Sequence, residues 1–258
     1  MALYNSIGRG YNCTHRPDLR IVEILVQLLD LPLGAKIADI GAGTGNYSRE
    51  LASLGYQVIA IEPSEMMQTQ AVQHPNVSWL LASAEQIPLG NNSVDGAIVM
   101  LALHHFQDID LGLREIQRIV DRGKIVIFAF EQDKIPDFWL TDYFPYFIQD
   151  TKTTFPSTKV IADKMKQITQ KRVEIMTFPL PKDLTDLFAA AGWCRPEIYL
   201  DAKVRNGISS FAKMTTQEVE SGLEKLAQEL KNGIWEEKYG ELRRLESYDA
   251  GYRIIVAY

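Results

Sequence analysis

The stretch Lys36-Ile-Ala-Asp-Ile-Gly-Ala-Gly-Thr-Gly-Asn46 decides the fold of this 258-residue chain. Its apolar first half predicts a short buried strand, its three glycines crowd one turn, and residues 47–54 predict a helix. α/β folds cradle nucleotides in this arrangement, because glycines let the backbone approach a ligand and the amides at the start of the helix face it. The stretch therefore predicts a cofactor site at the turn.

The spacing of the glycines narrows the cofactor. The dinucleotide fingerprint G-x-G-x-x-G would need glycine at positions 41, 43 and 46. Position 46 is Asn46, and the third glycine is Gly45. An NAD-dependent oxidoreductase of the Rossmann type is therefore the less favoured alternative.

Strands and helices alternate along the first half of the chain. Helices are predicted between successive strands, and a further helix starts at Asp18, before the first strand. The predicted strands lie over 37–40, 56–61, 77–81, 95–101 and 124–130. This rhythm is typical of a mostly parallel sheet covered on both faces. Further along we expect a helix over 184–192, a sixth strand over 197–204, a helix behind a capping box at Thr215, and a last strand over 252–258.

Composition excludes several classes of protein. The net charge of -6 disfavours nucleic-acid binding, which needs Lys and Arg to neutralise phosphates. No apolar run reaches the ~18 residues of a membrane span, and no signal peptide begins the chain, so we expect a cytoplasmic protein. Cys13 and Cys194 match neither a metal spacing nor a disulfide framework, and no metal is expected.

Four segments together resemble the class I S-adenosylmethionine-dependent methyltransferases, in the branch of the ubiquinone and menaquinone methyltransferases. Gly-x-Gly-x-Gly behind Asp39 resembles motif I of that family. The others, in the family's order, are Glu62-Pro-Ser-Glu-Met66, Ser83-Ala-Glu-Gln-Ile-Pro-Leu89 and Leu101-Ala-Leu-His-His-Phe106. The resemblance runs from about Tyr4 to Phe130 and is loose beyond it.

The resemblance implies an α/β fold, with a seven-stranded sheet that is parallel except for an antiparallel last strand and has helices on both faces. It implies one domain over 1–258. Within it, residues 1–30 would cover the cofactor, 34–131 would bind it, 132–182 would form an aromatic insert or lid, and 183–258 would lie on the substrate side.

The resemblance also implies S-adenosylmethionine as cofactor and S-adenosylhomocysteine as product. Glu62, 21 residues after Gly41, would accept hydrogen bonds from the ribose, and Pro63 and Met66 would line the adenine and ribose. Ser83 replaces the family's adenine-binding Asp, so its hydroxyl or the backbone of Ala84 and Glu85 would make that contact. The implied cofactor-binding set is completed by Tyr11, His15, Asp39, Gly41, Ala42, Gly43, Gly45 and Leu101.

The segment from Leu3 to Ile21 resembles a cofactor-covering segment in which a tyrosine and an arginine reach the methionine carboxylate. Tyr11 keeps the tyrosine. The arginine position is His15, with Arg16 beside it. The contact between a guanidinium and the methionine carboxylate would therefore be lost, moved by one residue to Arg16, or replaced by a contact of the imidazole. The alternative for Tyr11 is simple packing against the first helix.

His104 and His105 are the candidate catalytic residues. Imidazole titrates near neutrality, so either could act as a general base; the alternative is a structural role for both. Adjacent side chains point in different directions, which disfavours a metal site. The aromatic run over 138–147 would be a lid over an apolar substrate, or would only pack.

These features predict methyl transfer by in-line displacement to an O, N or C nucleophile of a small molecule. The sequence does not name the acceptor, and it leaves monomer and homodimer open. A non-catalytic S-adenosylmethionine-binding relative that acts through a partner is the second alternative, because Ser83 and His15 replace two binding residues of the family.

Overall fold

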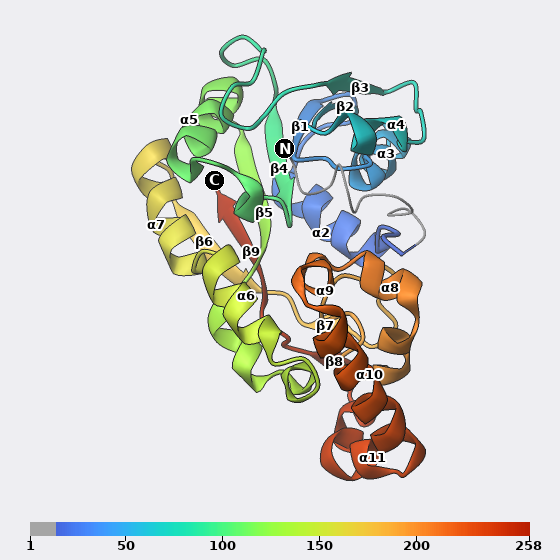
Figure 1. The fold of residues 1–258 in the computed structure, drawn as a ribbon. Helices are drawn as coiled ribbons and strands as arrows, with labels where there is room; N and C mark the ends of the chain where they lie inside the picture. Colours follow the sequence, from blue (N-terminus) through green and yellow to red (C-terminus); the bar gives the residue numbers. More distant parts are fainter. Residues whose placement is uncertain (1–13) are drawn as a thin grey trace.

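A seven-stranded sheet forms the centre of the computed structural model, which describes residues 14–258 (Figure 1). All neighbouring strands are parallel except β9, which runs antiparallel to both β5 and β6. The predicted fold class is therefore confirmed. The strands lie in the order β3 (Val77–Leu80), β2 (Gln57–Ile61), β1 (Lys36–Ile40), β4 (Gly96–Met100), β5 (Lys124–Phe130), β9 (Tyr252–Ala257) and β6 (Val173–Thr177).

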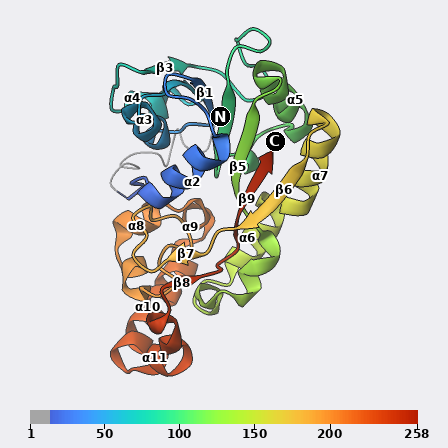
Figure 2. The ribbon, with the colours of Figure 1, turned by 180° about the vertical axis from the view of Figure 1, so that it is seen from behind.

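Helices cover both faces of this sheet, because its central strands are apolar on both sides. Helices α2 (Leu19–Leu29) and α3 (Asn46–Ser53) lie on one face, and α5 (Ile109–Val120) and α7 (Thr158–Thr169) on the other (Figures 1 and 2). Asp18 caps α2, as the predicted helix start requires, and Ser64 caps the short α4 (Glu65–Thr69).

A second group of elements lies beyond the carboxyl ends of the parallel strands (Figure 1). Between β5 and α7 the chain forms η3 (Gln132–Asp137), η4 (Trp139–Asp142) and α6 (Tyr146–Thr154). Between β6 and β9 it forms β7 (Leu180–Pro181), η5 (Pro196–Leu200), α8 (Ala202–Asn206), α9 (Ser209–Lys213), α10 (Thr216–Lys231), α11 (Ile234–Tyr239), η6 (Gly240–Arg244) and β8 (Ser247–Tyr248). The capping box at Thr215 is confirmed.

Two predicted elements are wrong. The predicted strand over 197–204 forms η5 and α8 instead, with Pro196 at the start of the 3-10 helix. The sixth strand of the sheet is β6, inside the range assigned to the insert. β6 is an edge strand with mostly exposed side chains, so it lacks the apolar signal of a central strand. The predicted helix over 184–192 forms turns, because tertiary contacts override its helical pattern.

Aromatic side chains fill the core of the second group. Trp193, Trp235 and Tyr199 are fully buried, and Trp139 packs edge-on against Trp235 and Tyr199. Within residues 14–258, no helix has both the length and the apolar character needed to cross a membrane.

Candidate active site

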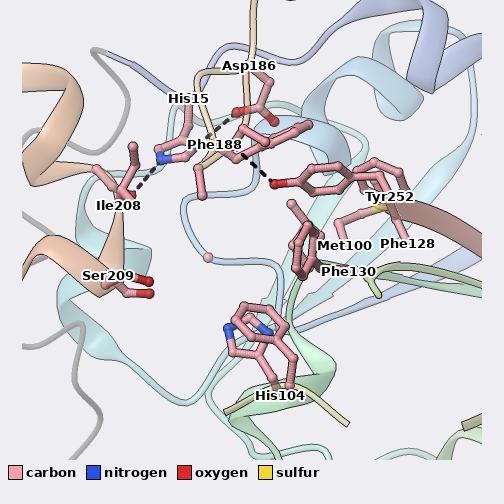
Figure 3. Close-up of a pocket in the computed structure, with 18 of the residues that line it drawn as sticks. His15, Met100, His104, Phe128, Phe130, Asp186, Phe188, Ile208, Ser209 and Tyr252 are labelled. Atoms are coloured by element: carbon pink, nitrogen blue, oxygen red, sulfur yellow. Dashed lines mark hydrogen bonds and ion pairs between the residues drawn. The ribbon is translucent and has the colours of Figure 1, made fainter. Parts of the chain in front are cut away.

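A cavity lies where the carboxyl ends of β1, β4 and β5 face α6 and α9 (Figure 3). One half is formed by the glycine turn and the start of α3, which is where an open α/β sheet places a ligand. The other half is formed by aromatic side chains and by residues 207–210. The turn side consists of Asp39, Gly41, Ala42, Gly43, Thr44, Asn46 and Tyr47.

The three glycines of the turn serve different purposes. All have positive φ, at 73°, 59° and 71° for Gly41, Gly43 and Gly45. A Cβ on Gly41 or Gly45 would lie 2.5 Å from Ala102 or Trp79, so packing alone requires glycine there. Among residues 14–258, a Cβ on Gly43 would meet only a methionine methyl, at 3.4 Å. Gly43 therefore leaves open space on the cavity side of the turn.

Asp39 is the most unusual polar group of the cavity. Its side chain is 1% exposed, and Ser48 Oγ donates to Oδ2 at 2.6 Å. Oδ1 has no hydrogen-bond partner within the described part of the chain. Burial raises the pKa of Asp39 to about 7, opposed by the Ser48 hydrogen bond and reinforced by the nearby charge of Glu62. A buried acceptor without a partner fits a cationic ligand.

Glu62 holds the turn together. Its two carboxylate oxygens accept from the amides of Gly43, at 3.0 Å, and Ser64, at 2.9 Å. Burial raises its pKa, and these two amides oppose the increase. The carboxylate thus fixes the backbone of Gly43 at the open side of the turn.

The remaining adenosine-side residues lie away from the cavity lining. Neither Glu62, Pro63, Met66 nor Ser83 is among the lining residues, and neither are Gly45, Ala84 and Glu85. Glu85 accepts from the amides of Gln107 and Asp108 at the start of α5. The adenine and ribose contacts of this set remain predictions.

The acceptor half of the cavity is apolar and aromatic. Phe128 and Tyr252 stack at 5.5 Å between centroids, and Phe130 packs edge-on against Tyr252 at 5.1 Å (Figure 3). Phe138 and Phe147, from the predicted aromatic run, line the cavity, whereas Trp139, Tyr143 and Phe144 of that run pack in the core. The remaining aromatic lining side chains are Phe155 and Phe188.

The two candidate catalytic histidines are placed differently. His104, in η2 (Leu103–His105), lines the cavity and packs against Phe155 at 4.2 Å between ring centroids. Burial lowers the pKa of His104 well below its ordinary value, with smaller effects from His105 and Lys213. The imidazole is therefore neutral at physiological pH. His105 is exposed and lies outside the lining. Leu101, just before them, lines the cavity with a positive φ of 49°.

His15 lies in the cavity wall with both ring nitrogens engaged. Nδ1 lies 2.8 Å from Asp186 Oδ1, and Nε2 lies 3.0 Å from the carbonyl oxygen of Gly207 (Figure 3). The predicted contact of His15 with the cofactor remains a prediction, and Tyr11 lies outside the described residues.

Several lining residues were not predicted as site residues. Asp186 falls in the range wrongly predicted as a helix, and Tyr47 donates to its second carboxylate oxygen at 2.9 Å. Residues 207–210 carry no motif at all. Phe128 and Phe130 were predicted only as strand residues, although their place at the carboxyl end of a strand was a usable signal.

This chain is similar to known proteins. The family model described as a methyltransferase domain matches residues 38–128, from β1 into β5. A solved structure from Anabaena variabilis ATCC 29413, described as a methyltransferase from an antibiotic biosynthesis pathway, is 48% identical. It has a TM-score of 0.92 and covers 95% of this chain and 99% of its own. The chain belongs to the class I S-adenosylmethionine-dependent methyltransferases.

Curated relatives of this methyltransferase confirm the predicted branch. A demethylmenaquinone methyltransferase of Corynebacterium kroppenstedtii is 27% identical over 74% of this chain and 84% of its own. A ubiquinone/menaquinone biosynthesis C-methyltransferase of Rubrivivax gelatinosus is 31% identical over 62% of this chain and 63% of its own. The predictions of a methyltransferase and of an enzyme are confirmed, and S-adenosylmethionine is the cofactor of the family.

Proposed function

We propose that this methyltransferase binds S-adenosylmethionine along the glycine turn and transfers its methyl group to an uncharged, apolar, ring-containing small molecule, with S-adenosylhomocysteine as the other product. The observation that carries the proposal is a single cavity with two unlike halves. One half has an open glycine and a buried carboxylate oxygen that has no partner among residues 14–258, and the other half is walled by aromatic rings.

The residues of the turn fit the cofactor. S-adenosylmethionine supplies a methyl group on a positively charged sulfur, beside an amino acid and an adenosine. Asp39 would balance positive charge of the ligand, and Gly43 would let the ligand approach the backbone of the turn. Glu62 would accept hydrogen bonds from the ribose while keeping the Gly43 amide in place. His15, Tyr11 and the adenine-side residues 63, 66 and 83–85 would complete the site.

The acceptor half would position its ligand mainly by shape. Seven aromatic rings exclude water and favour flat apolar groups over charged ones, since a charge buried among them would lose its hydration. The charged pair of this wall, His15 and Asp186, is already neutralised internally. Aligning the acceptor with the methyl donor is then the main catalytic contribution of the protein.

His104 would handle the proton of the acceptor. It lies in the aromatic half and stays neutral, so a ring nitrogen can accept a hydrogen bond and then a proton from a hydroxyl or an acidic carbon. We assign this role to His104 rather than to His105, because the His105 side chain lies outside the lining.

Turnover with a panel of acceptors tests the proposed function. We expect S-adenosylhomocysteine to form, by mass spectrometry, with uncharged phenols or hydroquinones that carry apolar substituents. Amines, phosphorylated compounds and carboxylates of the same size should give no product above background. Transfer confined to charged acceptors would contradict the proposal, and binding of the cofactor without transfer to any acceptor would favour a non-catalytic relative.

A further inference from the structure

The pair formed by His15 and Asp186 connects the two halves of the cavity. His15 precedes α2, and Asp186 lies between β7 and α8, 171 residues further along the chain. His15 and Asp186 are only 7% and 5% exposed. A chain of hydrogen bonds therefore runs from the carbonyl of Gly207 through His15 and Asp186 to the hydroxyl of Tyr47.

The partners of the imidazole determine its protonation. Asp186 Oδ1 and the Gly207 carbonyl are both acceptors, and Tyr47 already donates to the other carboxylate oxygen. A neutral imidazole carries one N–H and would turn a lone pair toward one of these oxygens. Both hydrogen bonds form together only when His15 is an imidazolium paired with the carboxylate. The raised pKa of His15 agrees with this, since Asp186 and Gly207 outweigh the opposing effect of burial.

Both ends of this chain of hydrogen bonds lie in the cavity wall. Tyr47 belongs to the first turn of α3, directly behind the glycine turn, and the neighbouring Asn46 donates to the carbonyl of His15 at 2.7 Å. Gly207 begins the wall segment 207–210. A side chain on Gly207 would come within 2.9 Å of the His15 ring, so glycine is what lets the imidazole reach this carbonyl.

A second buried carboxylate holds the far end of the same wall segment. Asp150 of α6 accepts from Ser210 at 2.7 Å and from Lys213 at 2.7 Å. This contact joins the wall to α6 on the acceptor side, whereas His15 joins it to the cofactor side through the hydrogen bonds described above. Loss of the His15 contact would therefore free the wall from the glycine turn and not from α6.

We propose that His15 and Asp186 are positioning residues, whose charged pair fixes the wall segment 207–210 of the acceptor cavity relative to the glycine turn. This inference rests on the proposed function of the cavity, and it gives His15 a role beyond the proposed cofactor contact. It also makes the wall sensitive to pH, because an imidazole that loses its second proton cannot donate to Gly207.

The charges around the pair set the direction of this dependence. Asp186 is the charged group that faces His15, and Tyr47 faces both Asp186 and Asp18. Asp18 is held by Arg20 and by the amide of Thr185, and Arg205 near the wall donates to the carbonyl of Tyr199. The raised pKa of His15 means that the wall is held below that pKa and released as the pH rises past it.

The first test is the protonation of His15 by ¹⁵N NMR of the imidazoles in the full chain, which has four histidines. His15→Gln assigns the signal. We expect His15 to carry two N–H protons at pH 7, while His104 carries one. A neutral His15 at pH 7 would overturn the proposal.

The second test measures the wall itself. In Asp186→Asn at pH 7, we expect hydrogen exchange across 205–210 to be at least about 10-fold faster than in the wild type, and the difference to shrink at high pH. Binding of the uncharged fluorophore N-phenyl-1-naphthylamine should weaken in parallel. Asp183→Asn, which makes the same change at an exposed carboxylate that pairs with Arg20 outside the cavity, is the matched control and should stay near the wild type. Equal exchange and dye binding in Asp186→Asn would contradict the proposal.

S-adenosylhomocysteine titrated into the same samples separates the two proposals. A wild-type protein that does not bind S-adenosylhomocysteine would contradict the proposed function. The NMR and exchange results would still decide the role of His15 and Asp186.

Discussion

Replacing Asp39 by Asn is expected to weaken S-adenosylmethionine binding by about 10- to 100-fold at pH 8, the range of one buried charged hydrogen bond. The carboxylate is 1% exposed, and one of its oxygens has no partner within residues 14–258. An amide keeps the shape and the Ser48 contact but carries no charge for a cationic ligand. Calorimetric titration of the two proteins measures the difference.

The pH dependence of this effect has a definite sign. Burial raises the pKa of Asp39 to about 7, so the wild-type carboxyl is largely ionised at pH 8 and largely protonated at pH 6. Wild-type affinity should therefore rise between pH 6 and pH 8, with release of a proton on binding near pH 7. The affinity of Asp39→Asn should stay flat, and the two proteins should converge at pH 6.

Asp95→Asn is the matched control for this experiment. Asp95 is an exposed carboxylate at the opposite end of β1, where it accepts from the amide of Lys36 at 2.7 Å. Its removal should leave the affinity and its pH dependence unchanged. A wild-type affinity that does not vary from pH 6 to pH 8 would contradict the assigned role of Asp39.

His104→Gln is expected to lower kcat by about 10²- to 10³-fold with an acceptor that must lose a proton, which is the usual contribution of a general base. Glutamine preserves polarity at the cavity wall but cannot take up a proton. Cofactor affinity should change little, because the His104 ring packs against Phe155 in the aromatic half of the cavity. Steady-state kinetics with the acceptor found in the turnover panel measures both quantities.

His105→Gln makes the same chemical change one residue further along, at an exposed side chain outside the cavity lining. Its kcat should stay within about 2-fold of the wild type, as for most surface changes. Because the pKa of His104 lies well below 6.5, its protonation should not limit the rate above pH 6.5. Wild-type turnover in His104→Gln would leave His104 with a structural role only.

The cofactor half of the site could be predicted because its signals are local. The strand, the glycine turn and the helix lie within one short stretch, and Glu62 reaches that turn from the end of the next strand. Parallel pairing of β1 and β2 brings the two together, and this pairing follows from the alternation of strands and helices. The same regularity predicted the first five strands and their mostly parallel direction.

The acceptor half could not be predicted because its contacts are long-range. His15 and Asp186 lie 171 residues apart in the sequence, and no periodic pattern in the sequence indicates that their side chains meet. Residues 184–192 have the apolar spacing of a helix, yet they form turns so that Asp186 and Phe188 can reach the cavity. The edge strand β6 has weak apolar character, and the apolar run near Tyr199 took its place in the prediction.

Calorimetric titration of the wild type and of Gly43→Val with S-adenosylmethionine, S-adenosylhomocysteine and NADH tests whether the glycine turn binds the cofactor. A valine there would fill the open side of the turn at a φ of 59°, so thermal melting first checks that the variant folds. We predict that the wild type binds both sulfur ligands with a Kd on the order of micromolar, ignores NADH, and loses the sulfur ligands in Gly43→Val. Unchanged affinity in the folded variant, or binding of NADH in place of the sulfur ligands, would contradict the account.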